Sequence, residues 1–300
     1  MKLRAFRAAV PSWARYDIWN VGIATLERPL EDVADLAHLA NVRWLPPQPP
    51  LHLVADPFPY RCDGRDWLLA EYYAHPRGIR GRIVRVDPDD GRGMAPAIER
   101  DHHVSYPYIF ADGDRTYCAP EMSQEDGCVI YALDSRGDWQ PAFHILRGTR
   151  IVDPTVFRFN GLWWLLGTEP PPRHTSVLHA YYASALEGAW RPHAGNPIKR
   201  DAASARPGGR PFAIRDRFYR PAQDCSATYG GAVQVMELLA LTPTEFDERI
   251  ALRLEARAEW PYPDGLHHLV VDGTHVYIDA KRTHVDWLLW LKTQGDGARG

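Results

Sequence analysis

The sequence is poor in sulfur: its 300 residues include four Cys and four Met. The cysteines form no CxxC pair and have none of the spacings typical of metal ligands, so no metal site and no cofactor are predicted. We expect free thiols in a reducing compartment. Cys118 and Cys128 are the exception that spacing leaves open, because they could face each other across a hairpin. The four positions are Cys62, Cys118, Cys128 and Cys225.

Several other signals are missing. The formal net charge is −3, which argues against a nucleic-acid partner, because phosphate binding needs a concentrated basic surface. No run approaches 18 consecutive apolar residues, so no membrane span is predicted. The N-terminal stretch "MKLRAFRAAVPSWARYD" is basic but lacks the apolar core of a signal peptide. GxGxxG and P-loop patterns are absent. We therefore expect a soluble, cytoplasmic globular protein.

What the sequence does contain is a repeated pattern. Residues 54–73, "VADPFPYRCDGRDWLLAEYY", and residues 151–170, "IVDPTVFRFNGLWWLLGTEP", share an Asp-Pro, an apolar run, a Gly turn, an aromatic strand and a Glu. Three weaker copies follow the same outline: "SYPYIFADGDRTYCAPEM", "GRPFAIRDRFYRPAQDC" and "GLHHLVVDGTHVYIDAK". Copies begin roughly every 50 residues, a period typical of propeller blades.

Each copy has the pattern of a β-hairpin, with alternating apolar runs around a "DG", "NG" or Asp-centred turn. In most copies a second pair of strands follows. Helical spacing of apolar residues is scarce, and residues 28–42 give its best example. The aromatic content of 11% suits strands. These patterns predict an all-β, five-bladed β-propeller with blades of about four antiparallel strands. A β-sandwich is the alternative, but it would not explain the recurring closing residue.

A propeller ring must be closed, because an open terminal blade leaves strand edges exposed. Residues 16–26 have the pattern of a strand, which we expect to complete the last blade beside residues 285–292. The expected organisation is an N-terminal segment, 1–50, with this closing strand and a short helix. The five-bladed propeller follows at 51–300, and the whole chain is one domain.

The residues that open and close each copy are expected to meet at one mouth of the central channel. The first strand of each blade is innermost, and a residue before Pro is held extended, which fixes where its side chain points. A hairpin places each opening residue near its own closing residue. The predicted opening residues are Asp56, Tyr106, Asp153, Arg210 and either His267 or His268, and the closing residues are Glu71, Glu121, Glu169 and Gln223.

Carboxyl groups crowded into one concave mouth repel each other and lose solvation, so some of their pKa values should rise. Division of such a set into an acid and a base is the basis of glycoside hydrolysis. The alternative is structural, because Asp before Pro commonly starts a turn and a repeated acid can bind backbone amides. Two Asp-Pro pairs at matching positions, each with a closing Glu, favour a functional role.

Several motifs resemble a known family: "ADPF", "SYPYIF", "APE", "VDPTVF", "SARPGGRPF" and "RPAQDCS". They are similar to the five-bladed propeller at the N-terminus of plant glucosamine inositolphosphorylceramide transferases and of bacterial relatives. The likeness runs from residues 19–24 to residues 241–246. More distantly, the sequence resembles furanosidase propellers of glycoside hydrolase families 43, 32 and 68. This resemblance implies that Asp56 is nucleophile or base, and that Asp153 holds sugar hydroxyls and steadies the transition state.

The general acid of those hydrolases does not transfer. Their acid lies near the start of blade four, where this chain has "SARPGGRPF", with Arg206 and Arg210 and no carboxylate. Glu121 or Glu169 would then serve as the acid. The two arginines either bind an anionic group such as a sugar phosphate or uronate, or form salt bridges to the acids. The predicted substrate-binding residues are Glu71, Tyr106, Arg206, Arg210, Gln223, Asp224, His267 and His268.

Three functions are consistent with these patterns. The first is a glycosidase-like hydrolase or transglycosidase acting on a small-molecule glycoside or sugar phosphate. The second is a non-catalytic carbohydrate-binding propeller beside a partner transferase, or a propeller recruited to another biosynthetic reaction. The third is a protein-interaction scaffold. Fold alone does not separate them. An enzyme requires two carboxyls free of internal salt bridges, whereas a scaffold predicts that the channel carboxylates are locked.

Overall fold

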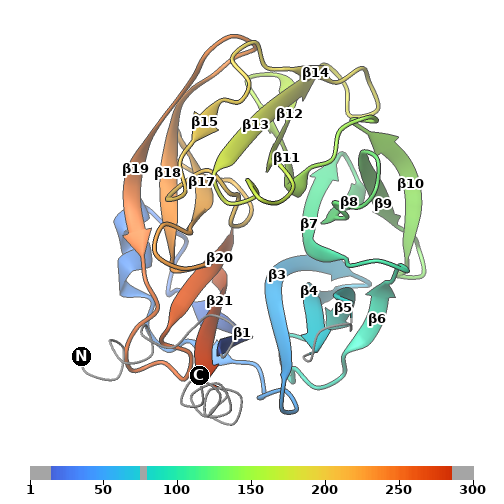
Figure 1. Cartoon of the computed structure of the whole chain (residues 1–300). Helices are drawn as coiled ribbons and strands as arrows, with labels where there is room; N and C mark the ends of the chain where they lie inside the picture. Colours follow the sequence, from blue (N-terminus) through green and yellow to red (C-terminus); the bar gives the residue numbers. More distant parts are fainter. Residues whose placement is uncertain (1–14, 75–79, 286–300) are drawn as a thin grey trace, which may run out of the picture.

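The computed structural model describes residues 15–74 and 80–285. Five antiparallel sheets are arranged as a ring, as Figure 1 shows in a view close to the ring axis. Four sheets have four strands and one has five. The predicted all-β, five-bladed propeller is therefore confirmed, and the alternative of a β-sandwich is wrong.

The first two blades follow the chain in simple up-and-down order. Blade one contains β3 (His52–Cys62), β4 (Arg65–Ala74), β5 (Arg82–Val86) and β6 (Ala95–Ile98). Blade two contains β7 (Ser105–Asp112), β8 (Arg115–Glu121), β9 (Cys128–Leu133) and β10 (Trp139–Ile145).

The next two blades contain longer connections. Blade three contains β11 (Val152–Phe159), β12 (Leu162–Thr168), β13 (Val177–Ala183), β14 (Arg191–Pro192) and β15 (Lys199–Arg200), and both β14 and β15 pair with β13. Blade four contains β16 (Phe212–Ile214), β17 (Arg217–Asp224), β18 (Ala232–Leu241) and β19 (Phe246–Leu254).

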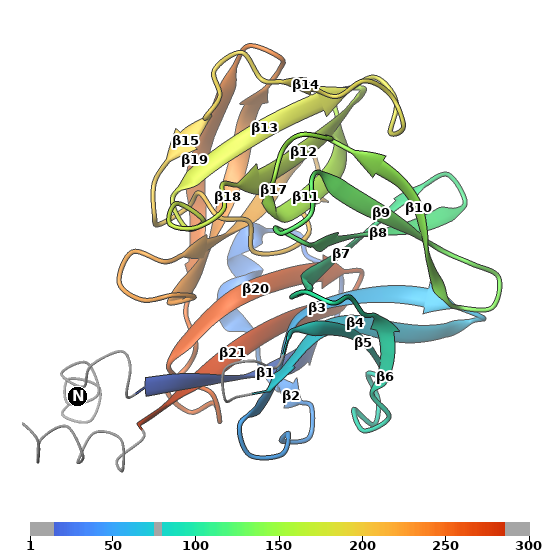
Figure 2. The same ribbon diagram turned by 45° about the vertical axis from the view of Figure 1, so that its right-hand side comes forward.

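Blade five joins the two ends of the described chain. Its order is β2-β1-β21-β20, where β20 spans Gly265–Asp272, β21 His275–Val285, β1 Arg15–Thr25 and β2 Arg43–Trp44. Strands β1 and β21 pair from Arg15↔Val285 to Thr25↔His275 and lie side by side in Figures 1 and 2. Ring closure by the N-terminal strand is thus confirmed. The partner of residues 15–25 is 275–285 rather than the expected 285–292, of which residues 286–292 lie outside the described residues.

The predicted helical segment contains a short 3₁₀ helix, η2 (Val33–His38), rather than a helix over all of 28–42. Asp32 caps it through its side chain, and Leu36 is buried against the propeller. The four cysteines are free thiols in the structure.

The innermost strands of blades one, two and three each contain a β-bulge at the X-Pro dipeptide. The strand register shifts between Ala55 and Phe58, between Ser105 and Tyr108, and between Val152 and Thr155. At each bulge the residue before Pro is left-handed, with φ of 52° at Asp56, 43° at Tyr106 and 51° at Asp153.

The expectation that these residues are extended is therefore wrong. A bulge inserts one extra residue, and that residue takes a conformation outside the regular strand. The left-handed conformation costs a non-glycine residue about 1–2 kcal/mol. All three residues are buried and hydrogen-bonded to another blade, Asp56 through its backbone N–H and Tyr106 and Asp153 through their side chains, which offsets this cost.

Blades four and five approach closely at a double glycine. Gly208 accepts a hydrogen bond from Leu269 N at 2.8 Å, and Gly209 N donates to the Tyr106 hydroxyl at 3.1 Å. A Cβ on Gly209 would lie 1.9 Å from the Leu269 oxygen, and its φ of +133° excludes most other residues. Glycine at position 209 therefore permits three blades to meet at the axis.

We predict that Gly209→Ala lowers the free energy of unfolding by about 3 kcal/mol or more, because steric clash and backbone strain act together. Urea denaturation measures this. Gly93→Ala is the matched control, since a Cβ there meets nothing within 4 Å, and it should change stability by about 0.5 kcal/mol or less. Equal losses in the two variants would contradict the close approach.

Candidate functional site

Four carboxyl groups from three blades gather around one arginine. Asp56 and Glu71 come from blade one, Glu121 from blade two and Asp153 from blade three, and Arg206 precedes β16 of blade four. The Glu71 carboxyl is close enough to Asp56, Glu121, Asp153 and Arg206 for each to affect its ionisation. We call these five residues the carboxyl cluster. The predicted convergence of Asp56 and Asp153, which are far apart in the sequence, is thus observed.

Asp153 is held firmly within the carboxyl cluster. Its Oδ2 accepts from Arg206 Nε at 2.6 Å and from Gln223 Nε2 at 3.1 Å, and its Oδ1 accepts from Arg206 Nη2 at 3.3 Å. Gln223 Nε2 also donates to the Pro207 carbonyl at 2.8 Å. Arg206 Nη2 lies 3.9 Å from Glu121 Oε2. Of the two roles that the sequence left open for Arg206, the structure shows the internal salt bridge.

Two members of the carboxyl cluster have raised pKa values. Burial raises the pKa of Asp153 to about 8; the Arg206 charge opposes this, while Glu121, by charge and hydrogen bonding, and Asp56 add to it. Burial also raises the pKa of Glu71 well above its usual value, with further contributions from the charges of Asp56, Glu121 and Asp153. Carboxyls of this cluster therefore hold protons near neutral pH, as crowding predicted.

Asp56 behaves in the opposite way. Burial alone would raise its pKa, but the charge of His267, the close approach and charge of His268, and the charge of Arg206 together lower it. The carboxyl cluster thus contains one carboxyl, Asp56, whose pKa is lowered, and two, Glu71 and Asp153, whose pKa values are raised. This division is the property that acid–base chemistry needs.

The two blade-five histidines lie behind Asp56. His267 is 3% exposed and His268 is fully buried. Both rings face Asp56 Oδ1, with His267 Nε2 at 3.8 Å and His268 Nδ1 at 3.4 Å. The far nitrogens are occupied, because His267 Nδ1 lies 2.6 Å from Asp279 Oδ1 and His268 Nε2 lies 3.1 Å from the Pro57 carbonyl. We expected these histidines to contact substrate, and their positions instead support Asp56.

Asp56, His267 and Asp279 offer ligand atoms within 4.8 Å of one another, which raises the question of a metal ion. The shortest of these separations, 2.6 Å between His267 and Asp279, is a hydrogen-bond distance. An ion shared by those two atoms would have to push them apart, because metal–ligand bonds of about 2 Å need wider ligand spacing. We therefore describe the three residues as a hydrogen-bonded set.

Exposed aromatic and imidazole rings border the carboxyl cluster. Tyr229 is 39% exposed, and the Arg206 guanidinium lies 5.2 Å from the centre of its ring. His103 is 41% exposed at its side chain and lies 3.4 Å from Glu71 Oε1. Trp19 stacks on His267 at 3.9 Å. Sequence reasoning missed Trp19 and Asp279, since both lie in ordinary strands and carry no motif.

Glu169 does not join the carboxyl cluster. It pairs with Arg173 at 2.6 Å and with His179 at 2.9 Å. The reason is register: Thr168 pairs with Val152, as Glu71 pairs with Ala55 in blade one. Thr168 thus takes the closing position of blade three, and the prediction of Glu169 at this site is wrong.

Arg210 lies at the opposite end of the innermost strands. It donates to the Pro59 carbonyl at 3.0 Å and lies 3.7 Å from Asp272. There it borders a pocket of about 530 Å³ with aromatic walls. The opening residue of blade four is Arg206, because its carbonyl accepts from Gln223 N at 2.8 Å. The prediction of Arg210 at the mouth is therefore corrected.

Two further predicted substrate-binding residues, Asp224 and Tyr106, are hydrogen-bonded to other residues of the protein. Asp224 accepts from Ser226 Oγ at 2.5 Å and from Arg253 Nη2 at 3.2 Å, on the strand face opposite to Gln223. The Tyr106 hydroxyl bonds to Thr155 Oγ1 at 3.0 Å and to the Gly209 backbone. Tyr106 therefore fills the ring axis.

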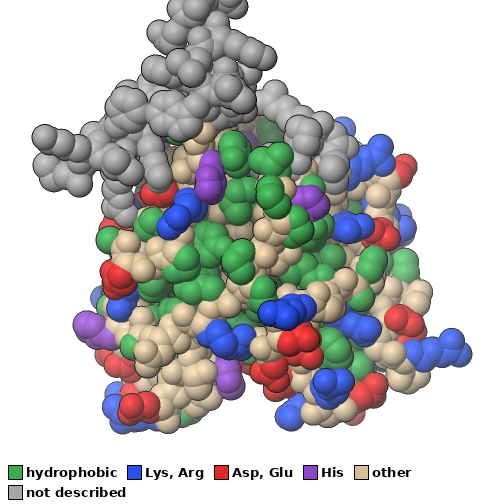
Figure 3. Space-filling view, turned by 90° about the horizontal axis from the view of Figure 1, so that it is seen from below, with side chains coloured by type: hydrophobic (Ala, Val, Ile, Leu, Met, Phe, Trp, Pro, Cys, Tyr) green, Lys and Arg blue, Asp and Glu red, His purple; other side chains and the backbone are tan. Residues whose placement is uncertain are grey.

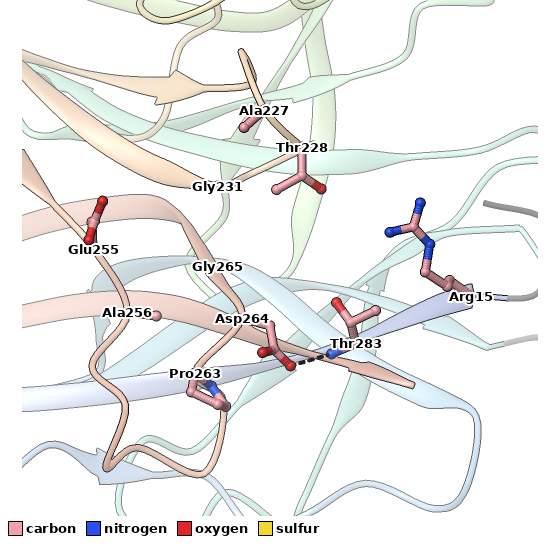
Figure 4. A pocket seen from close by; sticks show the side chains of 10 residues that line it. All are labelled: Arg15, Ala227, Thr228, Gly231, Glu255, Ala256, Pro263, Asp264, Gly265 and Thr283. Carbon is pink, nitrogen blue, oxygen red and sulfur yellow. Dashed lines mark hydrogen bonds between the residues drawn. The ribbon is translucent and has the colours of Figure 1, made fainter. Parts of the chain in front are cut away.

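A separate polar pocket of about 330 Å³ lies between blades four and five. Figure 4 shows Thr228 on one side of it and Asp264 and Thr283 on the other, with Asp264 Oδ2 accepting from Thr283 N at 3.0 Å. Thr228 adjoins Tyr229, so one loop borders both this pocket and the carboxyl cluster.

On the face seen in Figure 3, Lys and Arg side chains alternate with Asp and Glu among apolar groups, over the part that is not grey.

Within residues 15–74 and 80–285, no helix has the length and apolar character that crossing a membrane requires.

Comparison with known proteins identifies the family. A family model described as "Glucosamine inositolphosphorylceramide transferase 1, N-terminal" matches residues 48–263. The chain belongs to this family. It is 31% identical over 210 residues to glucosamine inositolphosphorylceramide transferase 1 of Oryza sativa subsp. japonica, and 30% identical over 218 residues to that of Arabidopsis thaliana. These matches cover 66% and 69% of this chain but 28% of each relative.

Solved structures share the fold. The chain superimposes with a TM-score of 0.50 and 10% identity on a family-43 β-1,3-galactosidase bound to galactodeoxynojirimycin, covering 66% of this chain and 75% of that one. An exo-β-1,3-galactanase from Clostridium thermocellum gives the same TM-score and identity, covering 74% and 58%. The region matched by the glucosamine inositolphosphorylceramide transferase N-terminal family includes the carboxyl cluster, whereas His267 and Asp279 follow it.

We predict that Arg206→Gln destabilises the fold by about 3 kcal/mol at high pH, because it leaves the Asp153 carboxylate buried without its partner. The folded-state pKa of Asp153 is raised, so below about pH 8 the carboxyl carries a proton and the loss is smaller. Urea denaturation at about pH 6.5 and about pH 9.5 measures the difference.

The control is Arg61→Gln, which removes an exposed pair with Asp66 at 3.5 Å and should cost about 0.5 kcal/mol or less at either pH. A loss in Arg206→Gln that is independent of pH would show that Asp153 stays ionised throughout this range.

Proposed function

We propose that this chain is a carbohydrate-active protein that binds a glycoside beside the carboxyl cluster and carries out glycosidase-like acid–base chemistry there, by hydrolysis or by glycosyl transfer. The observation that carries the proposal is the division of the cluster, in which the pKa of Asp56 is lowered while those of Glu71 and Asp153 are raised. Glycosidases need one carboxylate and one carboxylic acid on the two sides of the scissile bond.

Asp56 is the base or nucleophile in this proposal. Its Oδ1 is buried and accepts no hydrogen bond in the described structure, so the carboxylate is charged but not tied up by a close donor. Because Oδ1 is enclosed between the imidazoles, the other oxygen of this carboxylate would take a proton from water or attack a sugar carbon. The adjacent imidazoles of His267 and His268 stabilise the charge without closing a bond to it.

The acid is Glu121 or Glu71. Glu121 lies beside Asp153, whose pKa its charge and hydrogen bond raise, and 3.9 Å from Arg206. Glu71 retains its proton through burial and lies beside the exposed ring of His103. Asp153 itself is held by Arg206 and Gln223, which suits a residue that orients its neighbours rather than one that transfers a proton.

The structure favours a neutral glycoside over a sugar phosphate. Binding of a phosphate or uronate would need an arginine with free donors. Arg206 is engaged with Asp153, and Arg210 lies at the other end of the ring. Tyr229 supplies an exposed aromatic surface beside the carboxyl cluster, which is the kind of surface on which sugar rings stack.

A second candidate is a carbohydrate-binding propeller without catalysis that assists a partner transferase. The salt bridge that locks Asp153 favours it. So does the family comparison, because the relatives are named transferases and this chain matches 28% of their length. The two candidates differ in a single respect: the binding propeller holds a sugar and leaves its glycosidic bond intact.

The test is a thermal-shift screen of neutral sugars and sugar phosphates against the wild type, Asp56→Asn and Glu121→Gln, followed by assay of chromogenic glycosides. We expect a neutral sugar to raise the Tm of all three proteins, since both variants preserve size and polarity. Turnover should fall about 100-fold or more in Asp56→Asn, and it should fall as far in Glu121→Gln if Glu121 rather than Glu71 is the acid.

Asp224→Asn is the matched control, because this carboxylate bonds to Arg253 away from the cluster and should leave turnover unchanged. Sugar binding without turnover by the wild type would support the binding propeller. Identical melting curves with and without every sugar would exclude both candidates and leave the scaffold function.

A further inference from the structure

Asp279 makes contacts that neither the motifs nor the proposed function explain. It lies in the middle of β21 and is fully buried. Its Oδ2 accepts from the backbone N–H of Asp56 at 2.9 Å, and its Oδ1 lies 2.6 Å from His267 Nδ1 and 3.4 Å from His267 N. One carboxylate thus links the backbone of blade one to a side chain of blade five.

The hydrogen bond from Asp56 N to Asp279 replaces the strand partner that Asp56 N loses at the bulge. A bulged residue loses its regular partner in the strand ladder, and a buried N–H without a partner is costly. Asp56 is that residue, with a left-handed φ of 52°. Asp279 supplies the missing acceptor. Because it binds the amide of Asp56 rather than the carboxyl, it fixes the backbone from which that carboxyl projects.

The bond to His267 fixes a ring. With Nδ1 directed to Asp279, the opposite nitrogen, Nε2, faces Asp56 Oδ1 at 3.8 Å. Trp19 stacks on the same imidazole at 3.9 Å and prevents the ring from turning. The imidazole therefore lies between two carboxylates, and both favour its charged form.

The other charged groups near His267 are accounted for. Arg206 opposes a positive charge on the ring, and the Tyr229 ring contacts it edge-on at 5.5 Å. Lys281, which lies over Trp19, is held by Asp17 at 2.8 Å. The pKa of His267 is raised, since the charge and hydrogen bond of Asp279, with the charge of Asp56, outweigh burial and Arg206.

We propose that Asp279 is a positioning residue for Asp56, which it holds in two ways: directly, through the Asp56 backbone amide, and indirectly, through the orientation of the His267 imidazole. Asp279 would not touch substrate. Its role in catalysis rests on the proposed function, whereas the two contacts themselves can be tested without any substrate.

The experiment compares Asp279→Asn with the wild type by NMR and hydrogen exchange. Asn keeps the shape but not the charge, so it cannot satisfy both donors as well. We expect the Asp56 amide to exchange about tenfold faster or more, as loss of a hydrogen bond to a charged group predicts. The Nδ1 proton of His267 should lose its downfield resonance, and the pKa of the ring should fall.

Asp272→Asn is the matched control. This residue is the last of β20, the hairpin partner of β21, but its side chain is 55% exposed and pairs with Arg210. It should leave all three signals unchanged. Because Asp279→Asn can fail to fold, a second variant, His267→Gln, tests the two contacts separately. In it the Asp56 amide should stay protected, since its bond to Asp279 remains.

Failure of the positioning role is distinguishable from failure of the proposed function. If the neutral form of wild-type His267 carries its proton on Nε2 rather than Nδ1, or if Asp56 amide exchange is the same in Asp279→Asn, the positioning role is overturned whatever sugars bind. If those signals behave as expected and no sugar binds the wild type, the contacts are upheld and the proposed function fails. Metal bound stoichiometrically at His267 would also overturn the role.

Discussion

The whole site depends on a bulge in the innermost strand. A regular strand would alternate its side chains between the two faces of each blade. At Asp56, Tyr106 and Asp153 the chain instead takes a left-handed residue before Pro. These residues bond to other blades, Asp56 through its backbone N–H and the other two through their side chains. The strain persists because each bulge is fixed by contacts from another part of the ring. The carboxyl cluster therefore exists only where the blades pack against one another.

The division of pKa values within the carboxyl cluster follows from an imbalance of charge in a small buried volume. Four carboxyls face one guanidinium, which bonds to Asp153. The four carboxyls cannot all be ionised at low cost, so burial and mutual repulsion raise the pKa values of Glu71 and Asp153, in Asp153 against the opposing charge of Arg206. The pKa of Asp56 is lowered instead, because two histidines lie beside it. An ionised carboxylate and protonated neighbours are the result of this arrangement.

Much of the fold could be predicted because repetition is a strong signal. Five copies of one hairpin indicated five blades, and a strand left over at the N-terminus indicated how the ring closes. The convergence of Asp56 and Asp153 followed from their matching places in two copies. The failures came from register, which sequence does not fix to one residue. In "ARPGGRPF" both Arg206 and Arg210 precede Pro, and only pairing with Gln223 shows which one opens the blade. Thr168 and Glu169 were confused for the same reason. Asp279 could not be found, because a lone Asp in a strand shows no sign of the bulged amide that it binds.

The central claim is that one buried cluster keeps carboxyl groups in opposite protonation states. A carbon-13 NMR titration of the labelled Asp and Glu carboxyls, assigned with Asp56→Asn and Asp153→Asn, tests it most directly. The account predicts that Asp56 is still ionised at a pH where ordinary Asp side chains have taken up a proton, while Asp153 titrates near pH 8. Titration of both carboxyls together, in the range of solvent-exposed Asp, would contradict it.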